Sequence, residues 1–277
     1  MRITTIAVLM VFVAGDASAC RSQTAAGTAK ATSGSPAPDV PMESQAKNDH
    51  LTVGHRVHDI VKHPAFNGFG EHLLPWADNT QYYDTRLGRV GSLMPYHSHV
   101  DADVVVGALN GLIDEANAGK TIFYEFYTER QKQEDPDKRL TGLFFHRGKP
   151  GAPFAIVCPG GGFSYVGSLH EGFPLAREIS RKGLNAFVIR YRVDEQRATE
   201  DLAAAVSYVF RNAEVLGVGT RGYSLWGGSA GARMVAISHC AASPVTAAAT
   251  SPGRPRPSSP TPGRPAFPAI SRRPSSR

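Results

Sequence analysis

The segment Gly227-Gly228-Ser229-Ala230-Gly231 has the residue types and spacing of a catalytic serine turn. The apolar run "YSLW" precedes it and a helix-forming stretch follows it, so Ser229 is predicted to lie on a sharp strand-to-helix turn. Side chains in place of the two flanking glycines would clash in such a turn. The amide of Ala230, at the start of the helix, would then face negative charge that develops on a substrate oxygen. The spacing therefore indicates acyl transfer with Ser229 as the nucleophile.

A second glycine segment, Pro159-Gly160-Gly161-Gly162-Phe163, directly follows the apolar strand "AIVC". The amides of Gly161 and Gly162 are predicted to face a ligand at the carboxyl end of the sheet. A phosphate cradle or a plain strand-to-helix loop is the alternative. The dinucleotide fingerprint needs another glycine spacing, and no P-loop lysine follows. The pair of motifs, in this order, favours an oxyanion hole made by Gly161, Gly162 and Ala230.

His170 and Glu171 lie in the loop after the glycines. They are candidate substrate-binding residues, and the alternative is that they only hold the loop in place.

The elements that must position these residues are indicated by the hydrophobic pattern. Apolar strands alternate with helices after residue 150, which predicts a parallel sheet covered by helices on both faces. Two aromatic segments, 120–129 and 140–148, are joined by a charged, proline-containing stretch and predict an antiparallel hairpin. The predicted strands are "PFAIVC", "NAFVIRYR" and "RGYSLWG", and the predicted helices cover about 174–182, 199–216 and 230–240.

These motifs together resemble those of the α/β-hydrolases. The segments that carry the resemblance are "CPGGGFSYVG", "HEG", "LAREISRKGLNAFVIRYR", "EDLAAAVSYVFRNAEVLGV" and "YSLWGGSAGARMVA". The resemblance covers about residues 120–241 and is closest to the exported esterase and lipase-like branch, which includes carbohydrate-ester hydrolases. It implies Ser229 as nucleophile and the amides of Gly161, Gly162 and Ala230 as oxyanion hole. Pro159 stands where the family usually has histidine, as also occurs in the carbohydrate-esterase-like branch.

The other two members of a catalytic triad are not found where this resemblance places them. In that fold the acid and then the histidine follow the nucleophile. No Asp or Glu follows Glu214, and the only histidine after Ser229 is His239. His239 is ten positions along the same predicted helix, about 15 Å away at 1.5 Å per residue. We therefore expect an incomplete α/β-hydrolase fold, truncated after the serine turn, with little or no turnover.

Two upstream carboxylates, Asp194 and Asp201, are alternatives to the missing acid. Asp194 with His170 would be an unfamiliar arrangement, and Asp201 is expected to be a helix-start carboxylate. The segment 244–277 is rich in Pro, Arg and Ser, predicts disorder, and has the composition of a GC-rich gene translated in a shifted frame.

The function predicted from these residues is a serine hydrolase, a carboxylic ester hydrolase for small or carbohydrate-linked acyl esters. No cofactor is expected. A non-catalytic, surface-tethered ligand-binding protein and a serine peptidase of the same fold are the alternatives. The run His97-Ser98-His99-Val100-Asp101-Ala102-Asp103 could ligate a metal, but Asp101 or Asp103 is expected to cap a helix instead, and no metal site is predicted.

The charge distribution excludes a nucleic-acid partner. The chain carries 30 Lys and Arg against 24 Asp and Glu, but six of the arginines lie after residue 243, where no acid occurs. The remaining body is neutral and offers no positive surface for phosphates.

The N-terminus predicts export to the periplasm or cell surface. Arg2 precedes the apolar run 6–14, and Ala17 and Ala19 precede Cys20, where cleavage with or without lipid anchoring of Cys20 is open. Cys158 and Cys240 are expected to be buried free thiols. The predicted organisation is a signal peptide (1–19), a flexible tether (20–50), an N-terminal extension with one helix (51–119), a partial α/β-hydrolase domain (120–243) and the disordered tail (244–277).

Overall fold

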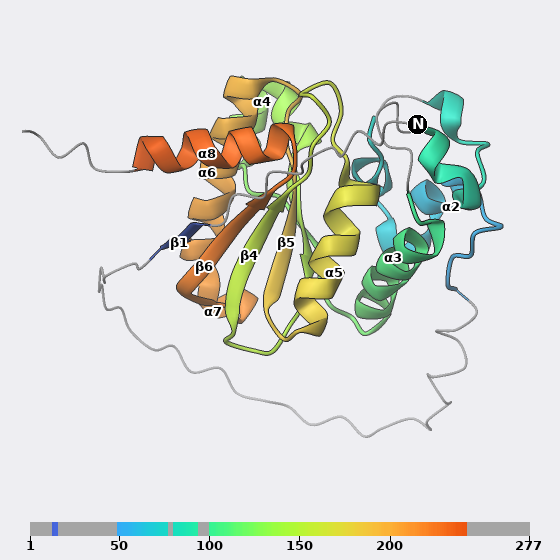
Figure 1. The fold of residues 1–277 in the computed structure, drawn as a ribbon, viewed down its shortest axis with the longest axis horizontal. Coiled ribbons are helices and arrows are strands. Elements are labelled where there is room, and N and C mark those ends of the chain that lie inside the picture. Colours follow the sequence, from blue (N-terminus) through green and yellow to red (C-terminus); the bar gives the residue numbers. More distant parts are fainter. Residues whose placement is uncertain (1–12, 16–48, 77–79, 94–99, 243–277) are drawn as a thin grey trace, which may run out of the picture. The chain divides into compact units, whose positions relative to one another are not determined.

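The computed structural model describes residues 13–15, 49–76, 80–93 and 100–242 (Figure 1). The predictions for the tail after residue 243, for Cys20, for His97 and His99 and for most of the signal peptide and tether lie outside the described residues.

A six-stranded sheet forms the centre of the described chain, in the order β1-β6-β4-β5-β3-β2. β4 pairs in parallel with β5 and with β6, and the other three pairings are antiparallel. The α/β class is therefore confirmed, but the sheet is mixed rather than mainly parallel, because helical crossovers connect only β4 to β5 and β5 to β6. The strands are β1 (Val13–Gly15), β2 (Phe123–Tyr124), β3 (Gly142–His146), β4 (Pro153–Cys158), β5 (Asn185–Arg190) and β6 (Gly219–Gly227).

The segment predicted as a hairpin contains more helix than the sequence pattern indicated. β2 and β3 do pair antiparallel, but β2 spans only two residues. The charged connection forms α4 (Glu129–Glu134) and η5 (Pro136–Leu140). Thr128 ends the extended segment because its side chain accepts from the amide of Gln131 in a reciprocal capping box.

The alternation of side chains along β4 divides the core into two layers. Ala155 and Val157 pack on one face with α3 (Ala102–Asn117), α5 (Phe173–Arg181) and the N-terminal extension. Phe154 and Ile156 pack on the other face with α6 (Glu195–Arg211) and α8 (Ala230–Ala242). The sheet is thus covered on both faces (Figure 1), as a buried, uniformly apolar parallel strand requires.

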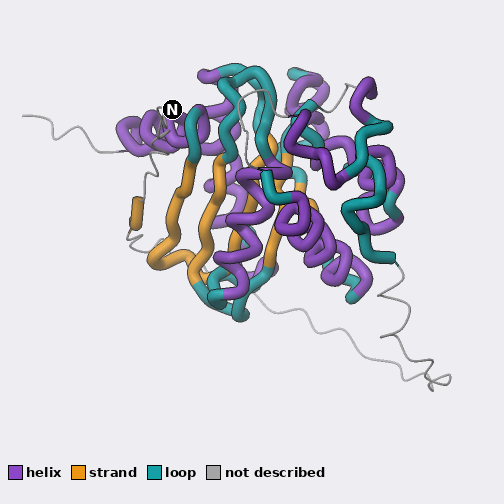
Figure 2. Tube along the Cα trace, turned by 45° about the vertical axis from the view of Figure 1, so that its right-hand side comes forward, coloured by secondary structure: helices purple, strands orange, loops and turns teal. Residues whose placement is uncertain are grey.

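The N-terminal extension consists mainly of short helices separated by loops (Figure 2). One helix was predicted in it, but the extension contains two α-helices, because the six residues of α2 are too few to show a helical period. Asp101 caps α3 by accepting from the amides of Asp103 and Val104, as predicted for this pair of candidates. Besides α3, the extension forms α2 (Val57–Lys62), η1 (Pro64–Phe66), η2 (Gly70–Leu73), η3 (Thr80–Tyr82) and η4 (Leu87–Leu93).

A short part of the predicted signal peptide belongs to the sheet. Residues 13–15 form β1 and pair antiparallel with β6, with Val13 opposite Leu225 and Gly15 opposite Tyr223. The apolar character that predicts an export signal is equally compatible with an edge strand, so the sequence alone does not separate the two.

Candidate active site

Ser229 lies at the junction between β6 and α8, in a strained backbone conformation. Its φ is 49°, in the left-handed region, and its side chain is exposed. A non-glycine residue there costs of the order of 1–3 kcal/mol and requires support from its surroundings. Glycine flanks it on both sides for a steric reason: a Cβ on Gly227 would lie 2.5 Å from the amide nitrogen of Ala232, and one on Gly231 would overlap the carbonyl of Cys158.

The glycine loop follows β4 directly and has its own positive-φ residues. Gly161 has φ 138° and Gly162 has φ 61°, values that favour glycine. The next residue, Phe163, is also left-handed at φ 55°. The loop is anchored at its start by the hydroxyl of Tyr191, which donates to the carbonyl of Pro159 at 2.6 Å. Burial raises the pKa of Tyr191, which keeps this donor protonated.

The structure brings the glycine loop and the serine turn together. The position that a Cβ on Gly160 would occupy lies 3.0 Å from Cβ of Ser229 and 3.1 Å from the carbonyl oxygen of Gly228. Gly160 therefore has no room for a side chain, and its backbone is in contact with the serine.

The amides of Gly161, Gly162 and Ala230 are those predicted to form the oxyanion hole. Within the described part of the chain, none of the three donates a hydrogen bond to a protein acceptor. The amide of Gly160 differs, because it donates to Oε2 of Glu171 at 2.5 Å. Gly161 and Ala230 are buried and Gly162 is exposed. Since buried amides are nearly always paired, the unpaired amides of Gly161 and Ala230 near an exposed serine indicate an anion-binding position.

The two candidate binding residues lie on η6 (Ser168–Gly172), a single π-helical turn before α5. The carboxylate of Glu171 contacts the glycine loop rather than pointing away from it. The side chain of His170 is only 4% exposed, and its Nε2 lies 3.8 Å from Oε1 of Glu171. His170 therefore presents little surface to a substrate in this structure.

The upstream carboxylates considered as a catalytic acid have structural partners. Asp194 caps α6 by accepting from the amide of Arg197. α6 begins at Glu195, earlier than predicted, so Asp201 is not a helix-start carboxylate. It is fully buried in the second turn of the helix and pairs with Arg192, whose Nη2 lies 2.8 Å from Oδ1. Prediction from the sequence missed this pair because the strand-like "NAFVIRYR" gave no indication that its second arginine turns toward α6.

His239 is part of the helix that begins beside the serine. It lies in α8 (Ala230–Ala242), and its side chain is outside the described atoms.

Three residues near the site were not singled out by the sequence patterns. Tyr191 holds Pro159, as described above, and the Nη1 of Arg190 donates to the carbonyls of Leu74 and Pro75 at 2.9 and 3.1 Å. The ring of Trp76 packs 5.0 Å from that of Tyr165, which follows the glycine loop. The N-terminal extension therefore borders the site. The run "RYR" (190–192), which begins at the last residue of β5, is the sequence signal for this contact between the extension and the site.

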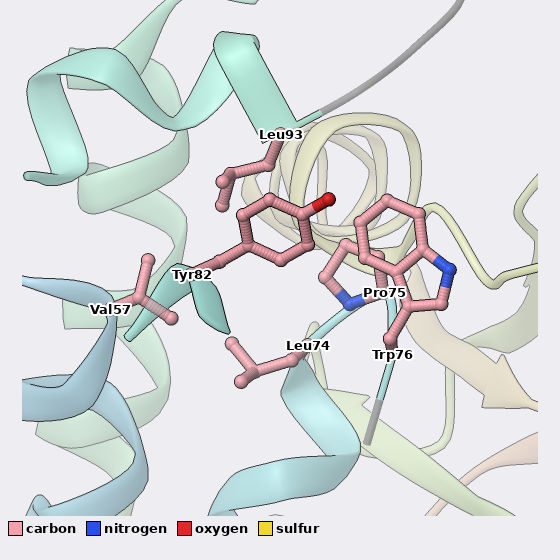
Figure 3. A pocket seen from close by; sticks show the side chains of 6 residues that line it. All are labelled: Val57, Leu74, Pro75, Trp76, Tyr82 and Leu93. Atoms are coloured by element: carbon pink, nitrogen blue, oxygen red, sulfur yellow. The ribbon is translucent and has the colours of Figure 1, made fainter. Parts of the chain in front are cut away.

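A small apolar cavity lies within the N-terminal extension (Figure 3). Its volume is about 10 Å³, which is enough for about one water molecule and not for a substrate. The rings of Trp76 and Tyr82 lie side by side there, with centroids 5.5 Å apart. The cavity is lined by Val57, Leu74, Pro75, Trp76, Tyr82 and Leu93.

No group of three or more His, Cys, Asp or Glu in the described residues could hold a metal ion. The thiol of Cys158 is free and buried, and burial raises its pKa. None of the described helices is both long enough and apolar enough to span a membrane.

Comparisons with known proteins give two partial similarities, and no family model matches the chain. Over 86 residues the chain is 33% identical to a protein named endo-1,4-beta-xylanase B from Butyrivibrio fibrisolvens; the match covers 28% of this chain and 13% of that protein. A solved α/β hydrolase, MGS-M1 from a Medee basin deep-sea metagenome library, is 28% identical with a TM-score of 0.28. That match covers 30% of this chain and 39% of the solved one, so the chain spans well under two thirds of either relative.

Proposed function

We propose that this chain is a serine hydrolase of the α/β-hydrolase type whose natural substrates are carboxylic esters. One observation carries the proposal: an exposed serine in a left-handed strand-to-helix turn touches a glycine loop, and three backbone amides around it have no acceptor among the described residues. Ser229 is the proposed nucleophile, and Gly161, Gly162 and Ala230 are the proposed oxyanion-hole donors.

The proposed reaction is acyl transfer to Ser229. The Oγ of Ser229 attacks the acyl carbon, the carbonyl oxygen takes the negative charge, and the three amides stabilise it. The carbon–oxygen bond to the alcohol then breaks. The alcohol leaves with the proton that the serine lost, and the acyl-enzyme remains.

We expect acylation by this chain to exceed its turnover by a wide margin. Hydrolysis of the acyl-enzyme needs a base to activate water, and a triad histidine is usually held by a carboxylate. No Asp or Glu follows Glu214 in this chain, and Asp194 and Asp201 are engaged elsewhere. An oxyanion hole alone retains part of the rate enhancement in other hydrolases, so a single acylation event is the expected activity.

As substrates, which donate the acyl group, we favour small or carbohydrate-linked esters. Support comes from the partial similarity to a protein named as a xylanase, together with the exposed position of Ser229.

The proposal is tested by labelling with a fluorophosphonate and by the burst of p-nitrophenol from p-nitrophenyl acetate. We expect stoichiometric labelling of Ser229, located by peptide mass spectrometry, and a burst of about one equivalent with negligible steady state. Ser229→Ala should abolish both. Ser180→Ala, a serine of α5 whose hydroxyl donates to the carbonyl of Arg177, is the matched control and should change neither. Labelling that persists in Ser229→Ala would reject the proposal.

Two further measurements on the wild type and Ser229→Ala separate the two alternative functions. Saturable binding of a xylo-oligosaccharide by an unlabelled protein, unchanged in Ser229→Ala, would favour the ligand-binding protein. A burst from an activated peptide amide that matches the ester burst would favour the peptidase.

Export and lipid attachment at Cys20 stay predictions from the sequence, because they depend on residues outside the described part of the chain. They are compatible with a hydrolase that meets its substrate at the cell surface.

A further inference from the structure

The carboxylate of Glu171 lies between the glycine loop and the serine turn. Its Oε2 accepts the amide of Gly160 at 2.5 Å. The same oxygen lies 2.9 Å from where a Cβ on Gly160 would be, and 3.0 Å from where a Cβ on Gly228 would be. Glu171 thus occupies the space that side chains at both glycines would need.

We propose that Glu171 is a positioning residue that couples the oxyanion loop to the nucleophile turn. This inference rests on the proposed function and assigns Glu171 a role other than substrate contact. The carboxylate orients the loop by holding Gly160, and it touches Gly228, the residue directly before the nucleophile.

The need for such an anchor follows from the composition of the loop. Three consecutive glycines have more accessible backbone conformations than any other tripeptide, and fixing them costs conformational entropy. The first of the three is held on both sides, because its amide donates to Glu171 and its carbonyl accepts from Gly167 at 2.9 Å. Gly161 and Gly162 keep their amides available as a consequence.

The negative charge of Glu171 is not what the anchor requires. An amide side chain also offers an oxygen acceptor, whereas a second negative charge close to a developing oxyanion opposes it. A glutamine at this position should therefore position the loop as well as the glutamate does. This separates a positioning role from general base catalysis, which glutamine could not perform.

The first test measures the rate and affinity constants for phosphonylation of Ser229. We expect Glu171→Ala to lower the maximal rate constant at least about tenfold with little change in the affinity constant, since a displaced oxyanion hole affects the transition state. Glu171→Gln should stay within about threefold of the wild type or exceed it. Glu178→Ala is the matched control, an exposed glutamate of α5 paired with Arg181, and should leave both constants unchanged.

A double-mutant cycle tests the contact with Gly228 directly. Gly228→Ala places a Cβ 3.0 Å from Oε2 of Glu171, tighter than ordinary contact, so it should slow phosphonylation in the wild-type background. In the Glu171→Ala background, Gly228→Ala should slow phosphonylation only slightly, because the carboxylate that the new Cβ would crowd is gone. Additive effects of the two substitutions would overturn the proposal.

Amide hydrogen exchange provides a readout that does not depend on reactivity. Glu171→Ala should speed exchange of the Gly160 amide, which donates to Glu171, and should leave α5 unchanged; Glu171→Gln should restore the slow exchange. If Ser229 is never labelled but this pattern is found, the proposed function fails and the positioning role stands. If Ser229 is labelled and Glu171→Ala matches the wild type in rate and exchange, only the positioning role fails.

Discussion

The carboxyl ends of neighbouring parallel strands differ in how their polar groups are used. Where β4 and β6 end, the amides of Gly161, Gly162 and Ala230 have no acceptor within the described chain. At the end of β5, between Arg190 and Arg192, the side chains have partners: Arg190 binds carbonyls of the extension and Arg192 pairs with Asp201. We call the ends of β4 and β6, with the amides of Gly161, Gly162 and Ala230, the open part of this edge. The end of β5, from Arg190 to Arg192, is the closed part.

This difference indicates which part of the edge carries function and which part carries stability. Buried unpaired donors are costly unless a ligand uses them, so the amides of Gly161 and Ala230 support the proposed reactive position. The closed part fixes the geometry on which the open part depends. The two are joined by Tyr191, which belongs to the closed part and donates to Pro159 in the open part.

The largest effect is expected from breaking the closed part with Asp201→Ala. Asp201 is fully buried and accepts from Nε and Nη2 of Arg192 and from the hydroxyl of Tyr127 at 2.7 Å. Its removal leaves these donors without that acceptor, while Nη1 of Arg192 keeps Asp135. We expect the free energy of unfolding to fall by about 3 kcal/mol in urea denaturation, because one carboxylate of the buried pair is lost and a second one remains. Asp137→Ala removes an exposed partner of Arg197 and should cost at most about 1 kcal/mol. Equal effects of the two substitutions would contradict the distinction between open and closed parts.

A medium effect is expected from acidification, through His146 on β3. Burial, assisted by Arg177, lowers the pKa of His146 to about 3, so the folded protein keeps it neutral while the unfolded chain protonates it below about pH 6.5. The stability that this group contributes is therefore present above pH 6.5 and is lost as pH falls toward 3. Between pH 6.5 and 5 we expect a loss of about 2 kcal/mol from this group alone.

The measurement is the free energy of unfolding against pH for the wild type and for His146→Phe. The variant should show a flatter profile in this window, whereas His55→Gln, at an exposed histidine, should keep the wild-type slope. A parallel profile for His146→Phe would show that the imidazole is not held neutral in the fold.

The smallest effect is expected at the link between the two parts, with Tyr191→Phe. The change removes one hydrogen bond to a buried carbonyl and should cost about 1 kcal/mol of stability. Phosphonylation of Ser229 should slow, but less than in Glu171→Ala, because Gly160 keeps its own anchor. A variant that loses stability without any change in phosphonylation would show that the closed part does not support the open one.

The two glycine-rich turns could be predicted from the sequence, whereas the contacts that hold them in place could not. Gly227, Gly231 and the three-glycine run are identifiable because steric demands on a tight turn leave few choices of residue. The long helices were predicted for the same kind of local reason, as at Asp101, which caps α3. The predictions of the turns and of the long helices rest on patterns within a few neighbouring residues.

Some of the errors concern contacts between distant segments. Three contacts depend on the assembled sheet: the pairing of Arg192 with Asp201, the hydrogen bonds from Arg190 to the extension, and the antiparallel pairing of β3 with β5. The bridging position of Glu171 is also a contact between distant segments, since η6 and the turn before α8 are far apart in the sequence. Two further errors are local: Asp194 caps α6, which begins at Glu195, and Thr128 caps the helix in the charged segment, and neither cap was used in the predictions from the sequence.

The bridge made by Glu171 has a consequence for sequence variation among relatives. Because one carboxylate oxygen fills the space above both Gly160 and Gly228, the three positions form a single steric unit. Relatives that keep the glutamate should keep both glycines, and relatives with alanine or serine at the position of Gly228 should carry a shorter side chain in place of Glu171. The three positions should therefore change together in evolution, although about 70 residues separate the first from the last.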